Sequence, residues 1–418
     1  MGRAPRHPPV RGGRVSATSQ VSPEPVRRSA TGTGSGLSER LAPAIAQAVE
    51  WAGEGLQALV VSGSHATGEA VWFGPADDAI SISDLDLYAV MCDDAACDAA
   101  RQRARAGRAA WADSPGAKAL AGALEVAFVT REGLARMPAR PGTVTLGRSA
   151  IVVWGDADVR GAIPHWEPAA VDAEERLLLL ENRAFELLYA ALAPTDGLDA
   201  LRARHAVLKT ALDAASARAL ARGEWPARVT TRIERARVAI SPAVPLALDG
   251  AWAGLEPLWE EALLWRARGA HSHVEVPLEP AWRAAVRGWC AVWWEVSGAW
   301  TRTSSAYGRA LAVARRGSIA RRLRRSLAFR ATQGPTAPVL DRLLRSFAGT
   351  PAQRIHGSAV VLLLAAATGA RPALPREASA ALATLGVTRA TGWDAAARET
   401  FEAWDRGLHE GLRCGGGR

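Results

Sequence analysis

The sequence predicts an α+β fold, with a small mixed sheet flanked by helices in the N-terminal part and an all-helical second half. Up to about residue 158, short apolar runs of β type alternate with stretches of helical periodicity, and beyond residue 168 only the helical periodicity continues. A chain of 418 residues that is 49% hydrophobic can bury a core in each part. We therefore expect one domain at residues 37–165 and a helical domain at residues 170–418.

The expected elements follow from residue spacing and turn signals. Apolar side chains recur at helical spacing over residues 38–52, and Gly53 and Gly55 end this helix. Short apolar runs predict strands at residues 56–62, 85–91, 124–130 and 150–154. Further helices are expected at residues 66–70, 95–111, 174–192, 198–222, 255–268, 280–300 and 339–347.

Terminal composition and hydropathy exclude two classes of segment. Residues 1–36 are rich in Arg, Pro, Ser and Gly and contain no apolar run, so we expect a disordered leader and no secretory signal. The longest apolar stretch, residues 359–367, is well short of the ~20 residues that a bilayer-spanning helix needs. We therefore interpret it as a core helix and expect no membrane association.

Charge and cysteine usage restrict the partners and the compartment. The net charge of +9 is carried by arginine, since Lys118 and Lys209 are the only lysines. This skew, with abundant alanine, indicates a GC-rich coding bias more than a surface for polyanions. The four cysteines lack paired ligand spacing, so neither a disulfide framework nor a zinc site is indicated, and a cytoplasmic location fits best.

Acidic residues stand beside the expected strands in a pattern that suits a metal site. Asp84 and Asp86 are two residues apart, so in an extended strand both side chains leave by the same face. Two carboxylates this close repel each other, and a cation relieves the repulsion. Mg²⁺ prefers oxygen ligands and often takes one or two carboxylates beside water and phosphates. We expect Asp84 and Asp86 to bind Mg²⁺, with Glu125 completing the site from a neighbouring strand.

With the preceding Gly-Ser turn, these acids match a known pattern. An apolar strand, Gly-Ser, Asp-x-Asp and a third acid are present at Gly63, Ser64, Asp84, Asp86 and Glu125. In these residues the stretch 56–156 resembles the DNA polymerase β-like nucleotidyltransferase superfamily, and within it the small bacterial aminoglycoside-nucleotidyltransferase type. The resemblance implies transfer of a nucleoside monophosphate from an NTP, with ATP expected, to a hydroxyl of a small-molecule acceptor. Two Mg²⁺ ions would support the exchange, and pyrophosphate would leave.

The resemblance implies a role for each motif residue. Asp84 and Asp86 would bridge the two ions, which hold the attacking and leaving oxygens. Glu125 would ligate the ion nearest the acceptor and would be placed to take the acceptor proton. Gly63 permits close backbone approach, and Ser64 can donate to the β- and γ-phosphates.

Three further features surround the motif. Lys209 lies on an expected helix after the catalytic domain, where many superfamily members place a lysine for the triphosphate. Ser64 and Asp84 are separated by 19 residues, more than compact members place there, so residues 72–82 are expected to form a surface loop or hairpin beside the site. His65 is expected to face solvent or the bound nucleotide.

The residues also leave other interpretations open. Asp84 and Asp86 alone suit a Ser-Asp turn with solvated acids on an edge strand. The acceptor could instead be RNA or protein, guided by the arginine-rich run 315–325, for which an exposed, solvated helix is the simpler interpretation. The fold could also serve a nucleotide-binding or antitoxin-like module that binds NTP without turnover.

One helical stripe in the second half is unusually rich in tryptophan. Its members follow one another at spacings of 7, 4 and 7 residues and are Trp282, Trp289, Trp293 and Trp300. Such a stripe is most simply part of a core or an interdomain seam. An aromatic platform for bases or sugars is the alternative.

Overall fold

The N-terminal part of the chain forms one mixed sheet of four strands. They are β1 (Leu56–Ser62), β4 (Leu85–Met91), β5 (Leu124–Thr130) and β6 (Ile151–Gly155). Their order in the sheet is β5-β4-β1-β6, with β1 antiparallel to both β4 and β6 and with β4 parallel to β5. The prediction of a small mixed sheet is confirmed, and β1, β4 and β5 have the predicted bounds.

The computed structural model describes most of the chain from residue 39 to residue 406. Within this span the residues not described are 76–77, 121, 195, 227, 238–247, 249, 271–276, 299–300, 302, 321, 324–348, 370 and 372. The expected leader 1–36, the expected helix 339–347 and Trp300 lie outside the described residues.

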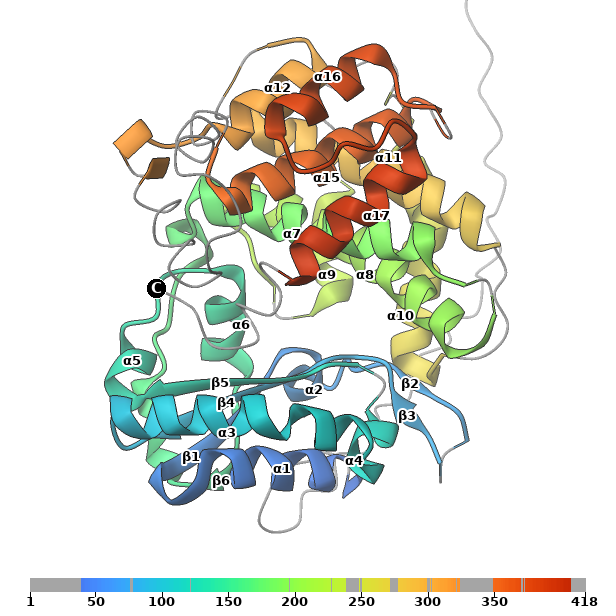
Figure 1. Ribbon diagram of the computed structural model, residues 1–418. Coiled ribbons are helices and arrows are strands. Elements are labelled where there is room, and N and C mark those ends of the chain that lie inside the picture. The colour runs from blue at the N-terminus through green and yellow to red at the C-terminus, as the bar shows by residue number, and fades with distance from the viewer. Residues whose placement is uncertain are drawn as a thin grey trace, which may run out of the picture. The chain divides into compact units, whose positions relative to one another are not determined.

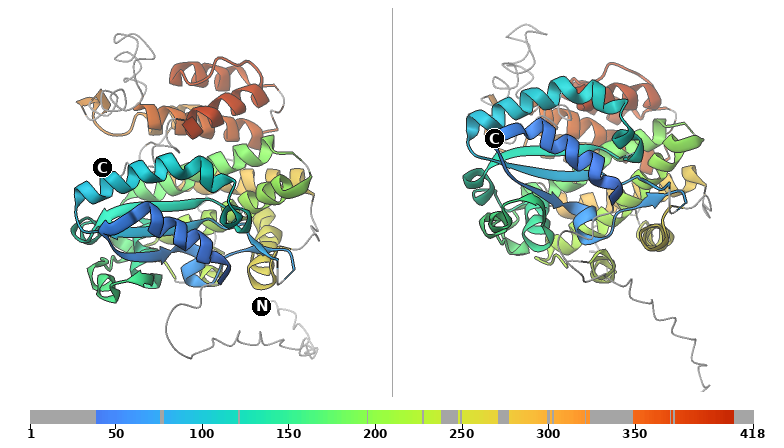
Figure 2. Two further views of the ribbon diagram at one scale, coloured as in Figure 1. Left: turned by 60° about the horizontal axis from the view of Figure 1, so that its bottom comes forward. Right: turned by 90° about the horizontal axis from the view of Figure 1, so that it is seen from below.

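Alternate side chains of the sheet enter different layers. Leu85 and Leu87 of β4 are buried in an apolar cluster with two helices, which pass across the strands in Figure 2. These helices are α1 (Ala42–Ala52) and α3 (Asp94–Ala112). Because successive strand side chains point to opposite faces, Asp86 leaves by the other face. That face is directed towards the helical part of the molecule.

Short helices connect the strands. They are α2 (Gly63–Thr67), α4 (Pro115–Ala119), α5 (Arg131–Ala135) and α6 (Pro141–Ser149). Elsewhere along the chain, 3-10 turns lie at Glu39–Leu41, Gly53–Gly55, Ala157–Ala162, Pro168–Ala170 and Ala253–Leu255. α2 begins three residues before the expected start at residue 66. The chain leaves β1 in an extended conformation at Ser62 and turns at once at Gly63, which has a φ of 67°. α2 ends at Gly68, which is left-handed.

The inserted residues between the motif's turn and its acids form a hairpin. β2 (Trp72–Phe73) pairs antiparallel with β3 (Ile80–Ser81). Of the two forms expected for residues 72–82, a surface loop or a hairpin, the structure has the hairpin. Phe73 is also bridged to Ala270, far along the chain. The hairpin therefore joins the sheet part to the helical part.

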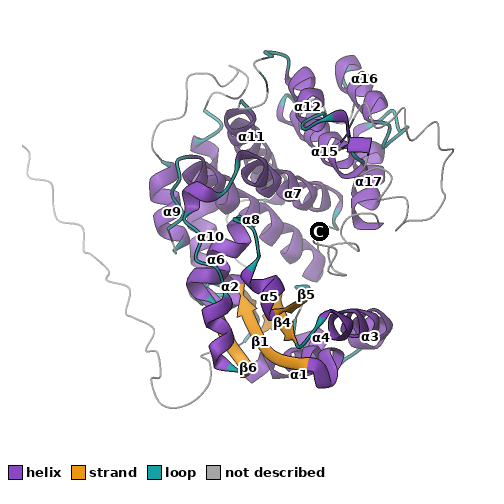
Figure 3. Ribbon diagram, turned by 90° about the vertical axis from the view of Figure 1, so that its left-hand side faces the viewer, coloured by secondary structure: helices purple, strands orange, loops and turns teal. Residues whose placement is uncertain are grey.

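Helices fill the rest of the described chain, and the strands gather in one part of the molecule (Figure 3). The helices are α7 (Ala173–Leu192), α8 (Gly197–Ala221), α9 (Val229–Ala236), α10 (Glu256–Arg268), α11 (Leu278–Ser297), α12 (Ala306–Ala314), α15 (Pro351–Ala367), α16 (Arg376–Leu385) and α17 (Trp393–Trp404). The helical second half is confirmed. α9, α12, α16 and α17 were not among the expected helices. α15 contains residues 359–367, which agrees with the prediction of a core helix there.

The tryptophan stripe lies inside the helical core. Trp282, Trp289 and Trp293 are each at most 2% exposed. The indole N–H of Trp282 donates to the Leu187 carbonyl at 2.7 Å, and that of Trp289 donates to the Leu180 carbonyl at 2.8 Å. The stripe is therefore a core seam between α11 and α7, and these three indoles offer no platform to a ligand.

Sheet and helices belong to one compact unit, residues Leu37–Arg418, so the boundary between residues 165 and 170 stays a prediction. Among the described residues, Cys92, Cys97 and Cys290 are free thiols. None of the described helices combines the length and the apolar content that crossing a bilayer requires.

Candidate active site

The structure brings the motif's turn and two of its acids together at one end of the strands of the sheet. Asp86 of β4 is in register with Glu125 of β5 on one side and with Ser62 of β1 on the other. Gly63 follows Ser62 directly and touches the Asp86 carboxylate, since a Cβ on Gly63 would lie 2.4 Å from Asp86 Oδ2. A glycine is needed here for two reasons, its positive φ and this close approach.

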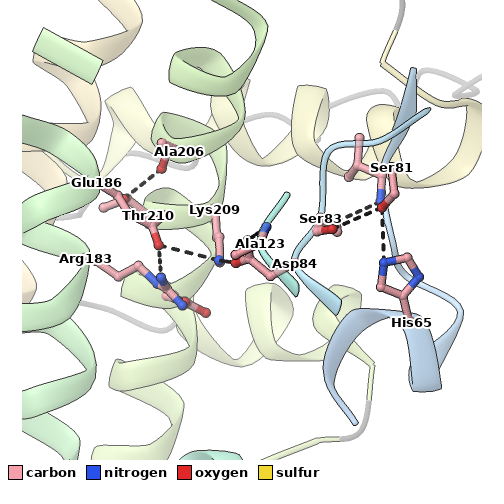
Figure 4. A network of polar contacts seen from close by, with 12 residues as sticks. His65, Ser81, Ser83, Asp84, Ala123, Arg183, Glu186, Ala206, Lys209 and Thr210 are labelled. Atoms are coloured by element: carbon pink, nitrogen blue, oxygen red, sulfur yellow. Dashed lines mark hydrogen bonds and ion pairs between the residues drawn. The ribbon is translucent and has the colours of Figure 1, made fainter. Parts of the chain in front are cut away.

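Asp84 lies just before β4 and is held by two donors (Figure 4). Its Oδ1 accepts from the Ala123 amide at 2.9 Å, and its Oδ2 accepts from Lys209 Nζ at 2.9 Å. Lys209 comes from α8, so this contact spans 125 residues of sequence and joins the helical part to the sheet. Asp84 and Asp86 are half-buried and flank the buried Leu85, in agreement with the same-face prediction.

The electrostatics separate the two aspartates. Burial, reinforced by the charges of Glu125 and Asp84, raises the pKa of Asp86 to about 7. Burial acts in the same direction at Asp84, but the Lys209 ammonium and the Ala123 amide outweigh it, so the pKa of Asp84 lies well below its usual range. Asp84 is thus already neutralised by a cation, whereas the raised pKa of Asp86 shows that the charge of this carboxylate is poorly balanced.

A chain of ion pairs continues from Lys209 into the helical part. Lys209 Nζ is 3.5 Å from Glu186 Oε1, Arg183 pairs with Glu186, and Arg183 Nε donates to Asp213 Oδ2 at 2.5 Å. Burial and Arg183 act to lower the pKa of Lys209, but Asp84 and Glu186 outweigh them and raise it. Lys209 is therefore a fixed ammonium placed by three charged neighbours, Asp84, Glu186 and Arg183.

No local pattern in the sequence distinguishes these helical partners of Lys209. Arg183, Glu186 and Asp213 lie on helices with many other charged residues, and a charge on a helix is usually solvated. Only the spacing of three on one helix turn relates Arg183 to Glu186, and this spacing is common on surface helices. Their relevance comes from the contact with Lys209 alone.

The β2–β3 hairpin contacts α2, the helix that begins at the Gly-Ser turn. His65 is 8% exposed, its Nε2 lies 3.1 Å from Ser81 Oγ, and its ring meets Trp72 edge to face at 5.7 Å. Burial lowers the pKa of His65. The expectation that His65 faces solvent or nucleotide is therefore wrong, because the inserted hairpin covers it and pairs it with a serine.

A small pocket lies on the other side of Lys209, between α8, α10 and the strand-like segment before the hairpin. It is lined by Val71, His205, Leu208, Lys209, Leu212, Ala262, Trp265 and Arg266. Burial and the Lys209 charge lower the pKa of His205 to about 3, so this ring is neutral at physiological pH. The pocket therefore presents two fixed cations, Lys209 and Arg266, beside a neutral imidazole.

The carboxylates at this site meet some, but not all, of the requirements for binding a hard divalent ion. Asp86 and Glu125 supply carboxylate oxygens at paired positions, and the raised pKa of Asp86 marks their need for positive charge. In the described residues, however, no three His, Cys, Asp or Glu side chains are gathered as a metal-binding group. The Asp84 carboxylate is bound to Lys209, so it would join Asp86 and Glu125 around an ion by exchanging that partner.

The arginine-rich run departs in part from the exposed, solvated helix that is the simpler interpretation of it. Arg316 and Arg322 are each 8% exposed. Arg316 binds both oxygens of Glu181, at 3.0 and 2.8 Å, and Arg322 donates to the Arg315 carbonyl at 2.5 Å. A wholly exposed, solvated helix is therefore wrong for these two residues, which point into the protein. Residues 321 and 324–325 of the run lie outside the described part.

No family model matches this chain, and no curated protein matches it significantly. The resemblance to the nucleotidyltransferase superfamily therefore depends on the motif residues and on the way the fold brings them together.

Proposed function

We propose that this chain is a magnesium-dependent nucleotidyltransferase that moves a nucleoside monophosphate from an NTP, ATP first among them, to a hydroxyl of a small-molecule acceptor. The observation that carries the proposal is the pairing of Asp86 with Glu125 beside Gly63. A Gly-Ser turn that touches one of two adjacent, mutually repelling carboxylates is the arrangement that phosphate and a divalent ion require together.

Each motif residue has a part in this reaction. Asp86 and Glu125, with Asp84, would hold two Mg²⁺ ions, which when bound supply charge neutralisation for the attacking and leaving oxygens. Gly63 leaves room for the Asp86 carboxylate, and Ser64 at the start of α2 would donate to the triphosphate. Glu125, at the edge strand of the sheet, would accept the proton of the acceptor hydroxyl.

Lys209 supports binding of the triphosphate. Its ammonium now neutralises Asp84 and lies between the sheet and the cation-lined pocket with Arg266. When ions occupy the carboxylates, the same ammonium would be free to pair with the β- or γ-phosphate, whose charge then replaces that of Asp84.

A small acceptor is favoured over nucleic acid by the arginine-rich run. Of its three described arginines, Arg316 and Arg322 are buried and paired within the protein, and only Arg315 is exposed. Arg316 and Arg322 therefore cannot serve as an electrostatic guide for a phosphate backbone. The basic charge of the chain is otherwise spread over many helices.

The test is incubation with each labelled NTP and Mg²⁺ against a panel of aminoglycosides, sugars, RNA and the protein itself, followed by mass analysis. The proposal expects one small hydroxyl compound to gain the mass of a nucleotide while pyrophosphate appears. Labelling of RNA with a steep loss at moderate salt would favour the macromolecular acceptor. Tight binding of Mg-ATP by calorimetry without any pyrophosphate would identify a nucleotide-binding module and contradict the proposal.

A further inference from the structure

Glu69, two residues after α2, connects the Gly-Ser turn to the helical part of the chain. Its amide donates to the Ser64 carbonyl at 2.8 Å, and its Oε2 accepts from Thr67 Oγ1 at 3.3 Å. These two contacts bind Glu69 to α2. The conformation of Ser64, the expected phosphate donor, is therefore tied to the position of Glu69.

The same residue binds two helices that are distant in sequence. Its Oε1 accepts from the Val229 amide at 3.0 Å, at the first residue of α9 and 160 residues away. Its carbonyl accepts from Arg266 of α10 at 2.6 Å, 197 residues away, and the Arg266 guanidinium is 4.0 Å from Oε2. A carboxylate at a helix N-terminus and beside a half-buried arginine is favourable on both counts.

The residues after Glu69 extend this junction. The Ala270 amide, just beyond α10, donates to the Trp72 carbonyl at 2.6 Å. Gly269 must be a glycine here, because its φ is 81° and a Cβ would lie 2.8 Å from that carbonyl. Val71 and Ile82 are buried in the apolar core of the helical part. We call residues 69–73 the junction segment.

α10 is in turn fixed to α8, the helix that carries Lys209. Glu261 of α10 binds Arg204 of α8 through both carboxylate oxygens, and the Trp259 indole of α10 donates to the Ala211 carbonyl of α8 at 2.9 Å. A rigid path therefore leads from the Ser64 carbonyl through Glu69 and Arg266 to α8.

We infer that Glu69 is a positioning residue that sets the Gly63–Ser64 turn and Lys209 in register, so that one triphosphate can meet both. This inference rests on the proposed function for its substrate. Glu69 touches no reacting atom; it acts through Ser64 on one side and through Arg266 on the other. Removing its carboxylate would leave the Val229 amide and the Thr67 hydroxyl without this acceptor and would abolish the 4.0 Å ion pair with Arg266. The backbone bonds of Glu69 to Ser64 and Arg266 would remain, so the turn would lose its side-chain anchor only.

The nucleotide arm of the test is a double-mutant cycle on Mg-ATP affinity, measured by calorimetry with Glu69→Ala, Lys209→Met and the double variant. Glu69→Ala should weaken binding about tenfold, and Glu69→Gln, which keeps an acceptor for Val229, less. In the Lys209→Met background the Glu69→Ala effect should shrink below about threefold, because the register with Lys209 no longer matters. Fully additive losses would overturn the inference.

The second arm needs no nucleotide and separates this inference from the proposed function. Amide hydrogen exchange of Glu69→Ala should rise at residues 64–69 above wild type. The matched control is Glu175→Ala, which removes another glutamate between the two parts, paired with Arg140 at 3.0 Å, and should leave that exchange unchanged. Unchanged exchange in Glu69→Ala overturns the positioning role, and Glu69→Gln serves if the alanine variant does not fold. Wild type that binds no Mg-ATP would overturn the proposed function alone, because the exchange result still decides on Glu69.

Discussion

Two buried acidic clusters in this molecule differ in how their charge is balanced. In the helical core, Arg316 binds both oxygens of Glu181 and also lies 3.7 Å from Glu174, and His356 Nδ1 lies 3.4 Å from Glu181 Oε2. Burial acts to raise the pKa of Glu181, but Arg316 and His356 outweigh it and the pKa is lowered. That cluster is complete within the protein.

The cluster at the sheet contains one carboxylate, Asp86, whose pKa is raised. Asp86 and Glu125 stand side by side, Asp84 is two residues away, and Lys209 makes its direct contact with Asp84. The pKa of Asp86 is raised where that of Glu181 is lowered. A buried carboxylate whose charge is matched stabilises a fold, and one whose charge is unmatched marks a place where a ligand supplies the missing cation.

The largest effect should come from breaking the unmatched cluster. Asp86→Asn removes one oxygen ligand and should reduce nucleotidyl transfer by about 10³-fold or more, since ion-assisted charge stabilisation is worth several kcal/mol. Its thermal unfolding midpoint should stay the same or rise, because a repelling charge is removed. Asp113→Asn, at an exposed position after α3, is the control and should retain full activity. An active Asp86→Asn enzyme would refute the metal assignment.

For the Glu181 cluster we expect the opposite effect on stability: removing its carboxylate should destabilise the fold. Glu181→Ala leaves Arg316 buried without its carboxylate and should lower the free energy of unfolding by about 3 kcal/mol, measured in urea. Glu132→Gln breaks the exposed pair with Arg136 and should cost below about 0.5 kcal/mol. If Glu181→Ala were as stable as Glu132→Gln, the distinction between structural and ligand-binding clusters would fail.

Substitutions at two glycines test the role of the Gly63–Ser64 turn. Gly63→Ala and Gly68→Ala both place a side chain at positive φ, 67° and 73°, but only at Gly63 would the Cβ meet Asp86; at Gly68 nothing lies within 4 Å. Both variants should lose about 1 kcal/mol of stability from backbone strain. Gly63→Ala alone should also lose about 10²-fold in turnover, because Asp86 is displaced. Equal turnover in the two variants would show that the Gly63 contact is unimportant.

The smallest effect is a dependence of stability on pH. The folded pKa of Asp86, about 7, lies above the ordinary aspartate value, so from pH 4 to 7 the unfolded chain is ionised at this group while the folded protein holds a proton. Its contribution to stability therefore falls as the pH rises through this window, by at most about 1.4 kcal/mol per pH unit. His205, with its pKa lowered to about 3, gives the opposite slope below pH 6.5.

The difference between wild type and Asp86→Asn isolates the aspartate from the histidine. In urea titrations at pH 5, 6 and 7, wild type should lose stability relative to Asp86→Asn with each step. A constant difference would mean that Asp86 titrates normally and that its charge is already balanced.

The sequence predicted the parts of this site that depend on short spacing. The alternation around Leu85 placed Asp84 and Asp86 on one face, the bounds of β1, β4 and β5 were right, and the single lysine of the helical half lies at the acids. These successes share a cause: strand alternation and turn chemistry act over a few residues.

The contacts that the sequence did not reveal are those between distant residues. Glu69 binds partners 160 and 197 residues away, and Arg316 pairs with Glu181 across 135. A glutamate or arginine in such a pair has the same local pattern as one in solvent, so only the fold distinguishes them. For the same reason His65 could not be recognised as buried before the hairpin was placed.

The most direct measurement is equilibrium binding of Mn²⁺, followed by electron paramagnetic resonance, in the presence of an ATP analogue with an uncleavable α,β bridge. Wild type should bind Mn²⁺ together with the analogue, and Asp86→Asn should lose that binding while Asp113→Asn keeps it. Wild type that binds no Mn²⁺ with the analogue, or an Asp86→Asn variant that binds it as tightly, would contradict the claim that these carboxylates hold divalent ions.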